Sequence, residues 1–347
     1  METLTLLNPS LVETLHYRME NNTMYDILIV GSGPVGLACG LEARKRGLDY
    51  LIVEKGGINE NMRKWPLYMT FFSTAEKVSI GDVPFPTQGD RPTREEGLAY
   101  YNAIVQQLGM PVKTFSPVEH IEKVENGFRV DTTHESLSAK KVILATGYYD
   151  QPNRLEIPGE DLPHVSHYLD DIFRYAGTKV LIVGGSHSAT DAALSLYRVG
   201  AEVTLVHRKP KLAEKLKYWV RPDLENRIKE GSIKAYMNTG LDRVTEQEVF
   251  LRNLNTNQVR SMPMDFVFIM TGYRPDVSLL SNAGIRIDGD DVPAHDPDTF
   301  ESNVPGLYVA GSITAGKHVS KIFIENGREH AKVIVEHAAQ HLPSYMS

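Results

Sequence analysis

Residues 27–36 read ILIVGSGPVG and residues 180–189 read VLIVGGSHSA, so each glycine-rich turn follows directly on an apolar run. Glycines permit a tight turn between a strand and a helix, and backbone N–H groups at the start of that helix can bind a pyrophosphate. One such motif is weak evidence. Two motifs in matching contexts predict a chain that binds two dinucleotides and passes electrons between them.

The residues around each turn predict a strand, a helix and a second strand. Such βαβ units form parallel sheets with right-handed crossovers. We therefore expect an α/β fold with two Rossmann-like, doubly wound nucleotide-binding domains. The expected elements are a strand from Tyr25, a helix to about Arg46 and a strand over 50–53 in the first unit, and a strand from Lys179, a helix over 189–199 and a strand over 202–206 in the second.

The remaining elements predict how the two domains share the chain. A last strand and helix follow both glycine turns, so we expect the chain to return and complete the first domain, with the second domain inserted in it. Residues 1–23 form an N-terminal extension, either a short docked helix or a disordered segment. The first domain covers 24–152 and 276–347, and the second covers 153–275. The further expected elements are a helix over 95–108, strands over 127–132, 141–144, 266–270 and 306–310, and a final helix over 321–341.

The charges after each unit distinguish the two dinucleotides. Glu54 ends the first unit, and a carboxylate there accepts hydrogen bonds from a ribose diol and repels a 2′-phosphate, which favours FAD or NAD. His207, Arg208 and Lys209 end the second unit, where cationic side chains neutralise the 2′-phosphate of NADPH. The alternative for the first motif is a glycine turn that only packs a helix on a strand. The alternative for His207, Arg208 and Lys209 is a solvated strand end without a ligand.

The predicted cofactor contacts gather around these turns and around the small residues that close later strands. Aromatic residues near 71–72 either stack on a cofactor or fill a domain seam. The predicted FAD contacts are Gly31, Gly33, Pro34, Val35, Gly36, Glu54, Lys55, Phe71, Phe72, Ala145, Thr146, Gly147, Gly311, Ser312 and Ile322. The predicted NADPH contacts are Gly184, Gly185, Ser186, His187, Ser188, Ala189, His207, Arg208, Lys209, Gly272 and Tyr273.

Composition excludes several other classes of function. The formal net charge of −7 gives no global positive field for nucleic acid. Neither a membrane-spanning run nor a signal peptide is evident, so we expect a cytoplasmic protein. Cys39 is the one cysteine, so no internal disulfide and no metal site are predicted. Cys39 is either a small packing residue or a nucleophile, and the second role needs a thiol that is accessible enough to ionise.

Four longer strings carry a resemblance to a known family. Residues 70–73 (TFFS), 79–85 (SIGDVPF), 145–149 (ATGYY) and 322–327 (IFIENG) are long and unusual. From Tyr25 onward, the chain resembles thioredoxin-reductase-type flavoproteins of low molecular weight and, more closely, the YpdA family of bacillithiol-disulfide reductases. The resemblance implies noncovalently bound FAD, NADPH as the reductant, a two-domain fold and a homodimer or homotetramer.

Three positions depart from the patterns of these families. Thioredoxin reductases carry a Cys-x-x-Cys pair that a chain with a single cysteine cannot form. YpdA-like proteins often have a cysteine just after the Gly-x-Gly-Pro turn, where this chain has Val35. Ser312 stands where the wider flavoprotein family usually has an aspartate that contacts the ribityl chain.

Three hypotheses of function follow. The first is NADPH-dependent reduction of a low-molecular-weight disulfide, with Cys39 as its candidate nucleophile. The second is a flavin reductase without thiol chemistry that passes electrons to ferredoxin, flavodoxin or a quinone, or an FAD monooxygenase. The third is a nonenzymatic redox sensor that binds both cofactors.

Overall fold

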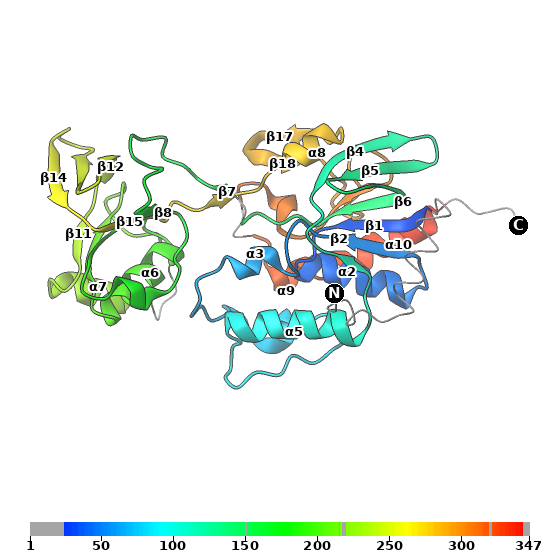
Figure 1. Cartoon of the computed structure of the whole chain (residues 1–347), viewed down its shortest axis with the longest axis horizontal. Coiled ribbons are helices and arrows are strands. Elements are labelled where there is room, and N and C mark those ends of the chain that lie inside the picture. The colour runs from blue at the N-terminus through cyan, green and yellow to red at the C-terminus, as the bar shows by residue number, and fades with distance from the viewer. Residues whose placement is uncertain (1–23, 150, 215, 217–219, 319–320, 343–347) are drawn as a thin grey trace, which may run out of the picture. The chain divides into compact units, whose positions relative to one another are not determined.

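The computed structural model describes residues 24–149, 151–214, 216, 220–318 and 321–342. The prediction for residues 1–23 lies outside this part of the chain. The chain divides into two compact units (Figure 1). Unit 1 is formed by Met1–Arg63, Thr70–Gln151 and Arg274–Ser347, and unit 2 by Lys64–Met69 and Pro152–Tyr273.

Unit 1 is built on a seven-stranded sheet whose central strands are parallel. The order is β3-β2-β1-β6-β5-β4, and β19 also pairs with β6. Strand β5 is antiparallel to its neighbours β4 and β6, whereas β3, β2, β1, β6 and β19 run parallel. The strands are β1 (Tyr25–Val30), β2 (Tyr50–Val53), β3 (Val112–Lys113), β4 (Val118–Val124), β5 (Gly127–Thr132), β6 (Ser136–Leu144) and β19 (Leu307–Val309).

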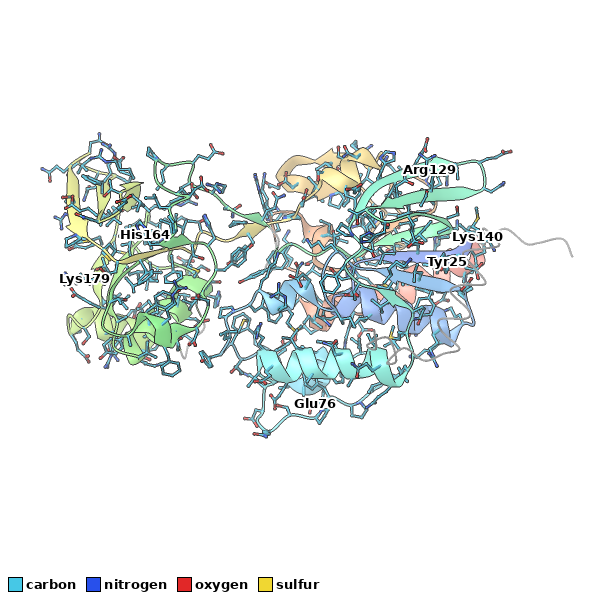
Figure 2. All side chains as sticks on the ribbon, in the orientation of Figure 1. Tyr25, Glu76, Arg129, Lys140, His164 and Lys179 are labelled. Atoms are coloured by element: carbon cyan, nitrogen blue, oxygen red, sulfur yellow. The ribbon has the colours of Figure 1, made fainter. Side chains whose placement is uncertain are left out.

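The central strands of unit 1 are apolar because the sheet buries them. Ile27, Leu28 and Ile29 of β1 and Ile52 of β2 are each 2% exposed or less. A strand covered on both faces reads as a continuous apolar run, which is the pattern of these residues. Tyr25 opens β1 and Lys140 lies on the adjacent β6, and both are labelled in Figure 2.

Helices from the two ends of the chain pack together on unit 1. Helix α2 (Pro34–Lys45), drawn in blue, contacts α10 (His330–Gln340), drawn in red (Figure 1). The first and last parts of the chain therefore share one domain. The other helices of the unit are α3 (Glu60–Arg63), α4 (Ala75–Val78), α5 (Arg94–Gln107), α8 (Ser278–Asn282) and α9 (Ile324–Gly327), with 3-10 turns η2 (Gly289–Asp291) and η3 (Gly311–Ala315) and a small hairpin of β17 (Ile287–Asp288) and β18 (Val292–Pro293).

Unit 2 repeats the strand–turn–helix pattern on a second parallel sheet, of order β11-β10-β9-β15-β8. A separate three-stranded antiparallel sheet has the order β12-β13-β14. The elements are β8 (Val165–Ser166), η1 (Ile172–Tyr175), β9 (Lys179–Val183), α6 (His187–Arg198), β10 (Glu202–Val206), α7 (Arg221–Lys229), β11 (Lys234–Tyr236), β12 (Thr239–Val244), β13 (Glu248–Asn253), β14 (Val259–Pro263) and β15 (Phe266–Ile269). Strands β7 (Gln151–Pro152) and β16 (Tyr273–Arg274) form a separate two-stranded sheet.

The predicted α/β class with Rossmann-like sheets is confirmed. The final helix is a correction, because the predicted span 321–341 holds two helices, α9 and α10. The N–H groups of Glu329 and Ala331 bond to the carbonyls three residues back, Asn326 and Arg328, and this tighter turn separates the two helices. Within the described residues, no helix is both long and apolar enough to cross a membrane.

Candidate nucleotide-binding sites

The carboxyl ends of four parallel strands align at one edge of the sheet of unit 1. Val30 is in register with Val53 on one side and with Leu144 on the other, and Leu144 pairs in turn with Val309. The residues that follow these four strand ends are therefore neighbours. This register, rather than any local motif, brings Gly31, Glu54 and Ala145 together. Gly311, at the turn that follows β19, lies near them.

The glycines of the first turn have different physical roles. Gly31 has φ +107°, and a Cβ on it would lie 2.5 Å from the carbonyl oxygen of Ala145. A Cβ on Gly36 would lie 2.0 Å from the carbonyl oxygen of Gly31. A Cβ on Gly33 would meet nothing within 4 Å. Gly31 and Gly36 thus permit close backbone packing, whereas Gly33 leaves open space in which a ligand can approach the backbone.

Helix α2 begins beside that open space. Its N-cap is Gly33, with Pro34 in the first turn, no side-chain cap and no acidic residue in the first turn. The first N–H groups of a helix have no partner within the helix and carry a partial positive charge. The start of α2 therefore has the free donors and the electrostatic character that a pyrophosphate requires.

Glu54 is buried at the end of β2 and hydrogen-bonded within the chain. One carboxylate oxygen accepts from the N–H of Ser32 at 2.7 Å and from its hydroxyl at 2.9 Å. The other accepts from the N–H of Gly56 at 3.1 Å. An ionised carboxylate can accept about four hydrogen bonds in total, so these contacts orient Glu54 and leave it capacity for a ribose hydroxyl.

Three polar side chains beside the turn have buried atoms without a partner among the described residues. These atoms are both amide atoms of Asn59, Oδ1 of Asn61 and Oγ1 of Thr146. The N–H of Asn59 donates to the Ser32 hydroxyl at 3.3 Å, and the Asn61 amide donates to the Thr146 carbonyl at 3.2 Å. Buried polar groups without partners are costly unless a ligand or water satisfies them. This cluster therefore fits a polar cofactor such as a flavin dinucleotide.

Asn59 and Asn61 are site residues that the sequence analysis missed. Asn59 lies directly before the short helix α3 and Asn61 lies within it, and neither forms a motif with the glycine turn. The one local signal is a pair of amide side chains two residues apart, a few residues after the end of β2.

Small residues close the other side of this site. Gly147 has φ +76°, and a Cβ there would lie 2.9 Å from Nδ2 of Asn61 and 3.9 Å from the hydroxyl of Ser312. Gly311 has φ +75°, and a Cβ there would lie 3.0 Å from Val35. The structure thus brings five predicted residues together with the missed Asn61: Ala145 and Gly147 after β6, Gly311 and Ser312 after β19, and Val35 on α2.

The remaining predicted FAD contacts differ in accessibility. Lys55 and Phe72 are exposed, and Ile322 is half-buried. Phe71 is 4% exposed and packs its ring against Phe85 at a centroid distance of 6.4 Å. Phe71 thus fills the interior of unit 1 and offers little surface to a cofactor, so its contact with FAD stays a prediction.

The second glycine turn occupies the equivalent edge of the sheet in unit 2. Val183 is in register with Val206 and with Ile269. A Cβ on Gly184 would lie 2.5 Å from the carbonyl oxygen of Met270 and 2.7 Å from the Cβ of Ala189. Helix α6 begins with Ser186 as its N-cap and has no acidic residue in its first turn. Its start therefore has the same anion-binding character as that of α2.

The three residues after β10 differ in their surroundings: His207 packs against the glycine turn, whereas Arg208 and Lys209 are exposed. The His207 ring lies against Gly185, where a Cβ would be 2.3 Å from Nδ1. Burial lowers the pKa of His207, and the charges of Lys209 and Arg208 lower it further. Arg208 and Lys209 are exposed. His207 thus packs over the glycine turn as a neutral ring, whereas the other two can meet a phosphate.

The other predicted NADPH contacts are residues at the start of α6 and two residues after β15, Gly272 and Tyr273. Ser186 and Ser188 are exposed, and His187 is half-buried. The Tyr273 hydroxyl donates to the carbonyl of His167 at 2.8 Å, and its ring is 5.3 Å from that of Tyr168. Tyr273 is therefore already engaged inside unit 2. Gly272 has φ +93°, which suits the turn that leaves β15.

Cys39 does not meet the condition for a thiol nucleophile. Its side chain is 0% exposed on the buried face of α2, and burial, aided by the charge of Glu42, raises the pKa of the thiol to about 12. A nucleophilic cysteine needs the thiolate form and access to its substrate. The candidate assignment of Cys39 as a nucleophile is thus corrected to a small packing residue.

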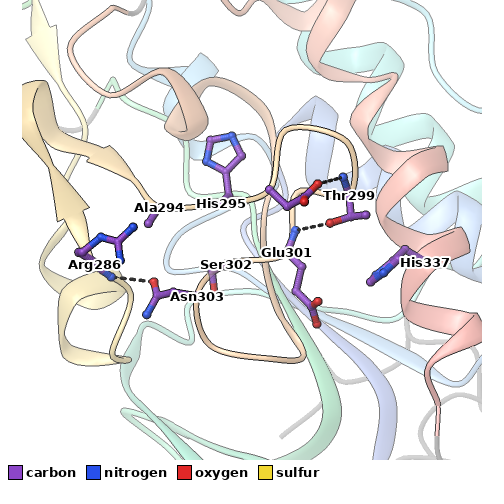
Figure 3. A pocket seen from close by; sticks show the side chains of 9 residues that line it. Arg286, Ala294, His295, Thr299, Glu301, Ser302, Asn303 and His337 are labelled. Atoms are coloured by element: carbon purple, nitrogen blue, oxygen red, sulfur yellow. Dashed lines mark hydrogen bonds between the residues drawn. The ribbon is translucent and has the colours of Figure 1, made fainter.

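A separate polar pocket of about 400 Å³ lies in unit 1 and contains none of the predicted site residues (Figure 3). Its walls include His295, Glu301 and His337. Among the described residues, no group of three or more His, Cys, Asp or Glu side chains could hold a metal ion.

Comparison with known proteins agrees with the two glycine turns. The model of a protein family described as pyridine nucleotide-disulphide oxidoreductase matches residues 28–311. The chain belongs to this family. It is therefore an oxidoreductase of a family that uses a flavin and a nicotinamide nucleotide.

Individual relatives show which members of this family the chain is similar to in sequence and in structure. The chain is 38% identical over 315 residues to the bacilliredoxin reductase Bdr of Bacillus subtilis (strain 168), covering 90% of this chain and 97% of that protein. A solved structure of the bacillithiol disulfide reductase Bdr (YpdA) of Bacillus cereus is 36% identical, with a TM-score of 0.89 over 92% of this chain and 99% of that one. A ferredoxin–NADP reductase of Ignicoccus hospitalis (strain KIN4/I) is 27% identical over 301 residues, covering 84% of this chain and 90% of that protein. The resemblance to the YpdA family is confirmed.

Proposed function

We propose that the protein uses NADPH and FAD to reduce a low-molecular-weight disulfide, such as bacillithiol disulfide. The substrate can equally be a disulfide on a bacilliredoxin, the partner that the name of the Bacillus subtilis relative indicates. The observation that carries the proposal is the pair of glycine turns at aligned strand ends, in a chain similar to Bdr proteins over nearly their whole length. The net reaction consumes one NADPH, one proton and one disulfide and yields NADP⁺ and two thiols.

The residues of unit 1 would hold FAD. The start of α2 and the open face of Gly33 would receive the pyrophosphate, and Glu54 would accept from the ribose. Asn59, Asn61 and Thr146 would satisfy polar groups of the cofactor. FAD, when bound, supplies the two-electron step between nicotinamide and disulfide, and the protein supplies binding, orientation and electrostatics.

The residues of unit 2 would hold NADPH. The start of α6 would receive its pyrophosphate, and Arg208 with Lys209 would neutralise the 2′-phosphate. Hydride transfer itself needs no acid or base from the chain. The cytoplasmic location and the homodimer or homotetramer stay predictions, and light scattering tests the second.

Electrons would reach the disulfide without a covalent bond to this chain. The single cysteine is fully buried, so no thiol of the protein is available to form a mixed disulfide. The S–S bond of the substrate would therefore break on direct transfer of two electrons, and its sulfurs would take up two protons.

The burial of the single cysteine also favours a second candidate function. A chain without an accessible thiol can also pass electrons to ferredoxin or a similar carrier, and one relative is a ferredoxin–NADP reductase. This candidate predicts rapid carrier reduction and no disulfide-dependent NADPH oxidation.

Anaerobic reduction by NADPH, followed by a panel of acceptors, tests the proposal. We expect NADPH to bleach the flavin absorbance and bacillithiol disulfide, alone or with its redoxin, to restore it. Cys39→Ser should retain disulfide turnover within about twofold, because the thiol is buried. If Cys39→Ser folds, binds FAD and loses only disulfide turnover, the thiol-independent route is wrong. If ferredoxin alone restores the absorbance, the second candidate replaces the first.

A further inference from the structure

A buried histidine of α10 accepts a backbone hydrogen bond from the strand end of β19. His330 is 8% exposed, and its Nδ1 accepts from the N–H of Gly311 at 3.2 Å. A ring nitrogen that accepts carries no proton, so the neutral ring holds its proton on Nε2. Burial and the nearby His295 lower the pKa of His330 to about 4, which agrees with a neutral ring at physiological pH.

Gly311 forms the corner at which β19 turns beside the first glycine turn. Its φ of +75° requires glycine, and the side chain of Val35 on α2 lies against it. The preceding N–H, of Ala310, donates to the carbonyl of Leu144, and the Gly311 carbonyl accepts from the Thr314 hydroxyl at 2.7 Å. The backbone of this corner is thus held from β6, from η3 and, through His330, from α10.

The His330 ring is itself fixed by a stack of rings. Phe300 lies 4.0 Å from it between centroids, at an interplanar angle of 20°. His295 also stacks on Phe300, at 5.9 Å between centroids and 13°, and it lines the pocket in Figure 3. Phe300 has φ +60°, which is unusual for an aromatic residue, and its carbonyl accepts from the N–H of Val309 on β19. Strand β19, which ends two residues before Gly311, therefore also anchors the stack that orients His330.

We infer that His330 is a positioning residue for the FAD site, whose neutral imidazole fixes the Gly311 corner against Val35 by accepting its N–H. The inference rests on the proposed use of FAD in unit 1. Without the acceptor, a buried N–H loses its partner, and the corner relaxes toward conformations that satisfy it. Because Gly311 contacts Val35 on the first turn of α2, this relaxation reaches the site that would receive the pyrophosphate.

Two substitutions separate the acceptor from the ring. His330→Phe keeps a ring that can stack on Phe300 and removes the acceptor, whereas His330→Asn loses the ring and keeps an acceptor at the δ position. His341→Asn, an exposed position just after α10, is the matched control. The readout is the FAD dissociation constant of the apo-proteins, measured from quenching of flavin fluorescence, with circular dichroism to check folding.

We expect His330→Phe to weaken FAD binding by about tenfold or more, while His330→Asn and His341→Asn stay within about threefold of wild type. Equal affinity in His330→Phe and wild type overturns the inference. Equal losses in His330→Phe and His330→Asn also overturn it, because an acceptor retained at the δ position would then fail to preserve FAD binding. Wild-type protein that binds no FAD contradicts the proposed function instead.

A spectroscopic measurement reads the tautomer of His330 in the wild-type protein itself. Long-range ¹H–¹⁵N correlation spectra of histidine side chains report the tautomer, and His330→Asn or chemical-shift mapping assigns the signal. We expect His330 to be the neutral Nε2–H tautomer at pH 7. A charged ring or the Nδ1–H tautomer at that pH overturns the inference.

Discussion

Arg208 and Lys209 follow β10 at exposed positions, whereas Glu54 follows β2 as a buried, hydrogen-bonded side chain. The ligands proposed for the two sites give this difference a physical reason. A ribose diol needs an oriented acceptor, which hydrogen bonds from Ser32 and Gly56 provide. A 2′-phosphate carries strong charge and can be met by flexible cations at the surface.

Removing the two cations should change the preference between nicotinamide nucleotides. We expect the double variant Arg208→Ala and Lys209→Ala to raise the KM for NADPH by about tenfold or more, because each charge-assisted contact with a phosphate contributes about 1.5 kcal/mol or more. The KM for NADH should change little and serves as the internal control. Steady-state kinetics with both nucleotides measure the effect, and equal changes in both KM values would argue against contact with the 2′-phosphate.

Helix α5 shows a local signal that sets an element boundary. The Thr93 hydroxyl accepts from the N–H of Glu96 at 3.2 Å, and the Glu96 carboxylate accepts from the N–H of Thr93 at 2.7 Å. This reciprocal capping box starts the helix at Arg94, close to the predicted start at residue 95. The split of the predicted final helix has no such signal, because it depends on backbone bonds that tighten after Gly327.

Loss of this cap should destabilise unit 1 modestly. We expect Thr93→Ala to lower the free energy of unfolding by about 1 kcal/mol, the usual loss for an N-cap threonine. Glu95→Gln, in the same turn, is the control and should have a smaller effect. Urea denaturation followed by circular dichroism measures both, and equal stability of Thr93→Ala and wild type would show that the cap contributes nothing.

At the scale of the whole molecule, buried histidines predict how stability depends on pH. Burial lowers the pKa of His167, His207 and His330. The unfolded chain takes up protons on histidine near pH 6.5, before the folded chain does. Stability from these groups is thus complete above about pH 6.5 and is lost as the pH falls toward the folded pKa, which is about 4 for His330.

We therefore expect the urea midpoint to be lower at pH 5.0 than at pH 7.5. His330 alone should account for a loss on the order of 1 kcal/mol, since each pKa unit corresponds to about 1.4 kcal/mol and the ring is not fully desolvated. His330→Asn should show a smaller loss between the two pH values. A midpoint that stays constant or rises at pH 5.0 would contradict this reading of the buried rings.

Sequence alone determined the two glycine turns, the contrast between Glu54 and the Arg208–Lys209 pair, and the single cysteine. These features are encoded in consecutive residues or in composition, so they can be identified without knowledge of the tertiary structure. Most strand boundaries were predictable for the same reason, because apolar runs between turn residues mark buried strands.

Only the tertiary structure decided which residues meet. The burial of Cys39 and Phe71, the approach of Asn61 to Thr146, and the bond from Gly311 to His330 each depend on segments far apart in the chain. Parallel register and helix packing bring such segments together, and neither leaves a local pattern in the sequence. The turns therefore predicted two nucleotide sites, while the fold placed the lone thiol in the interior and the His330 ring against the backbone of Gly311.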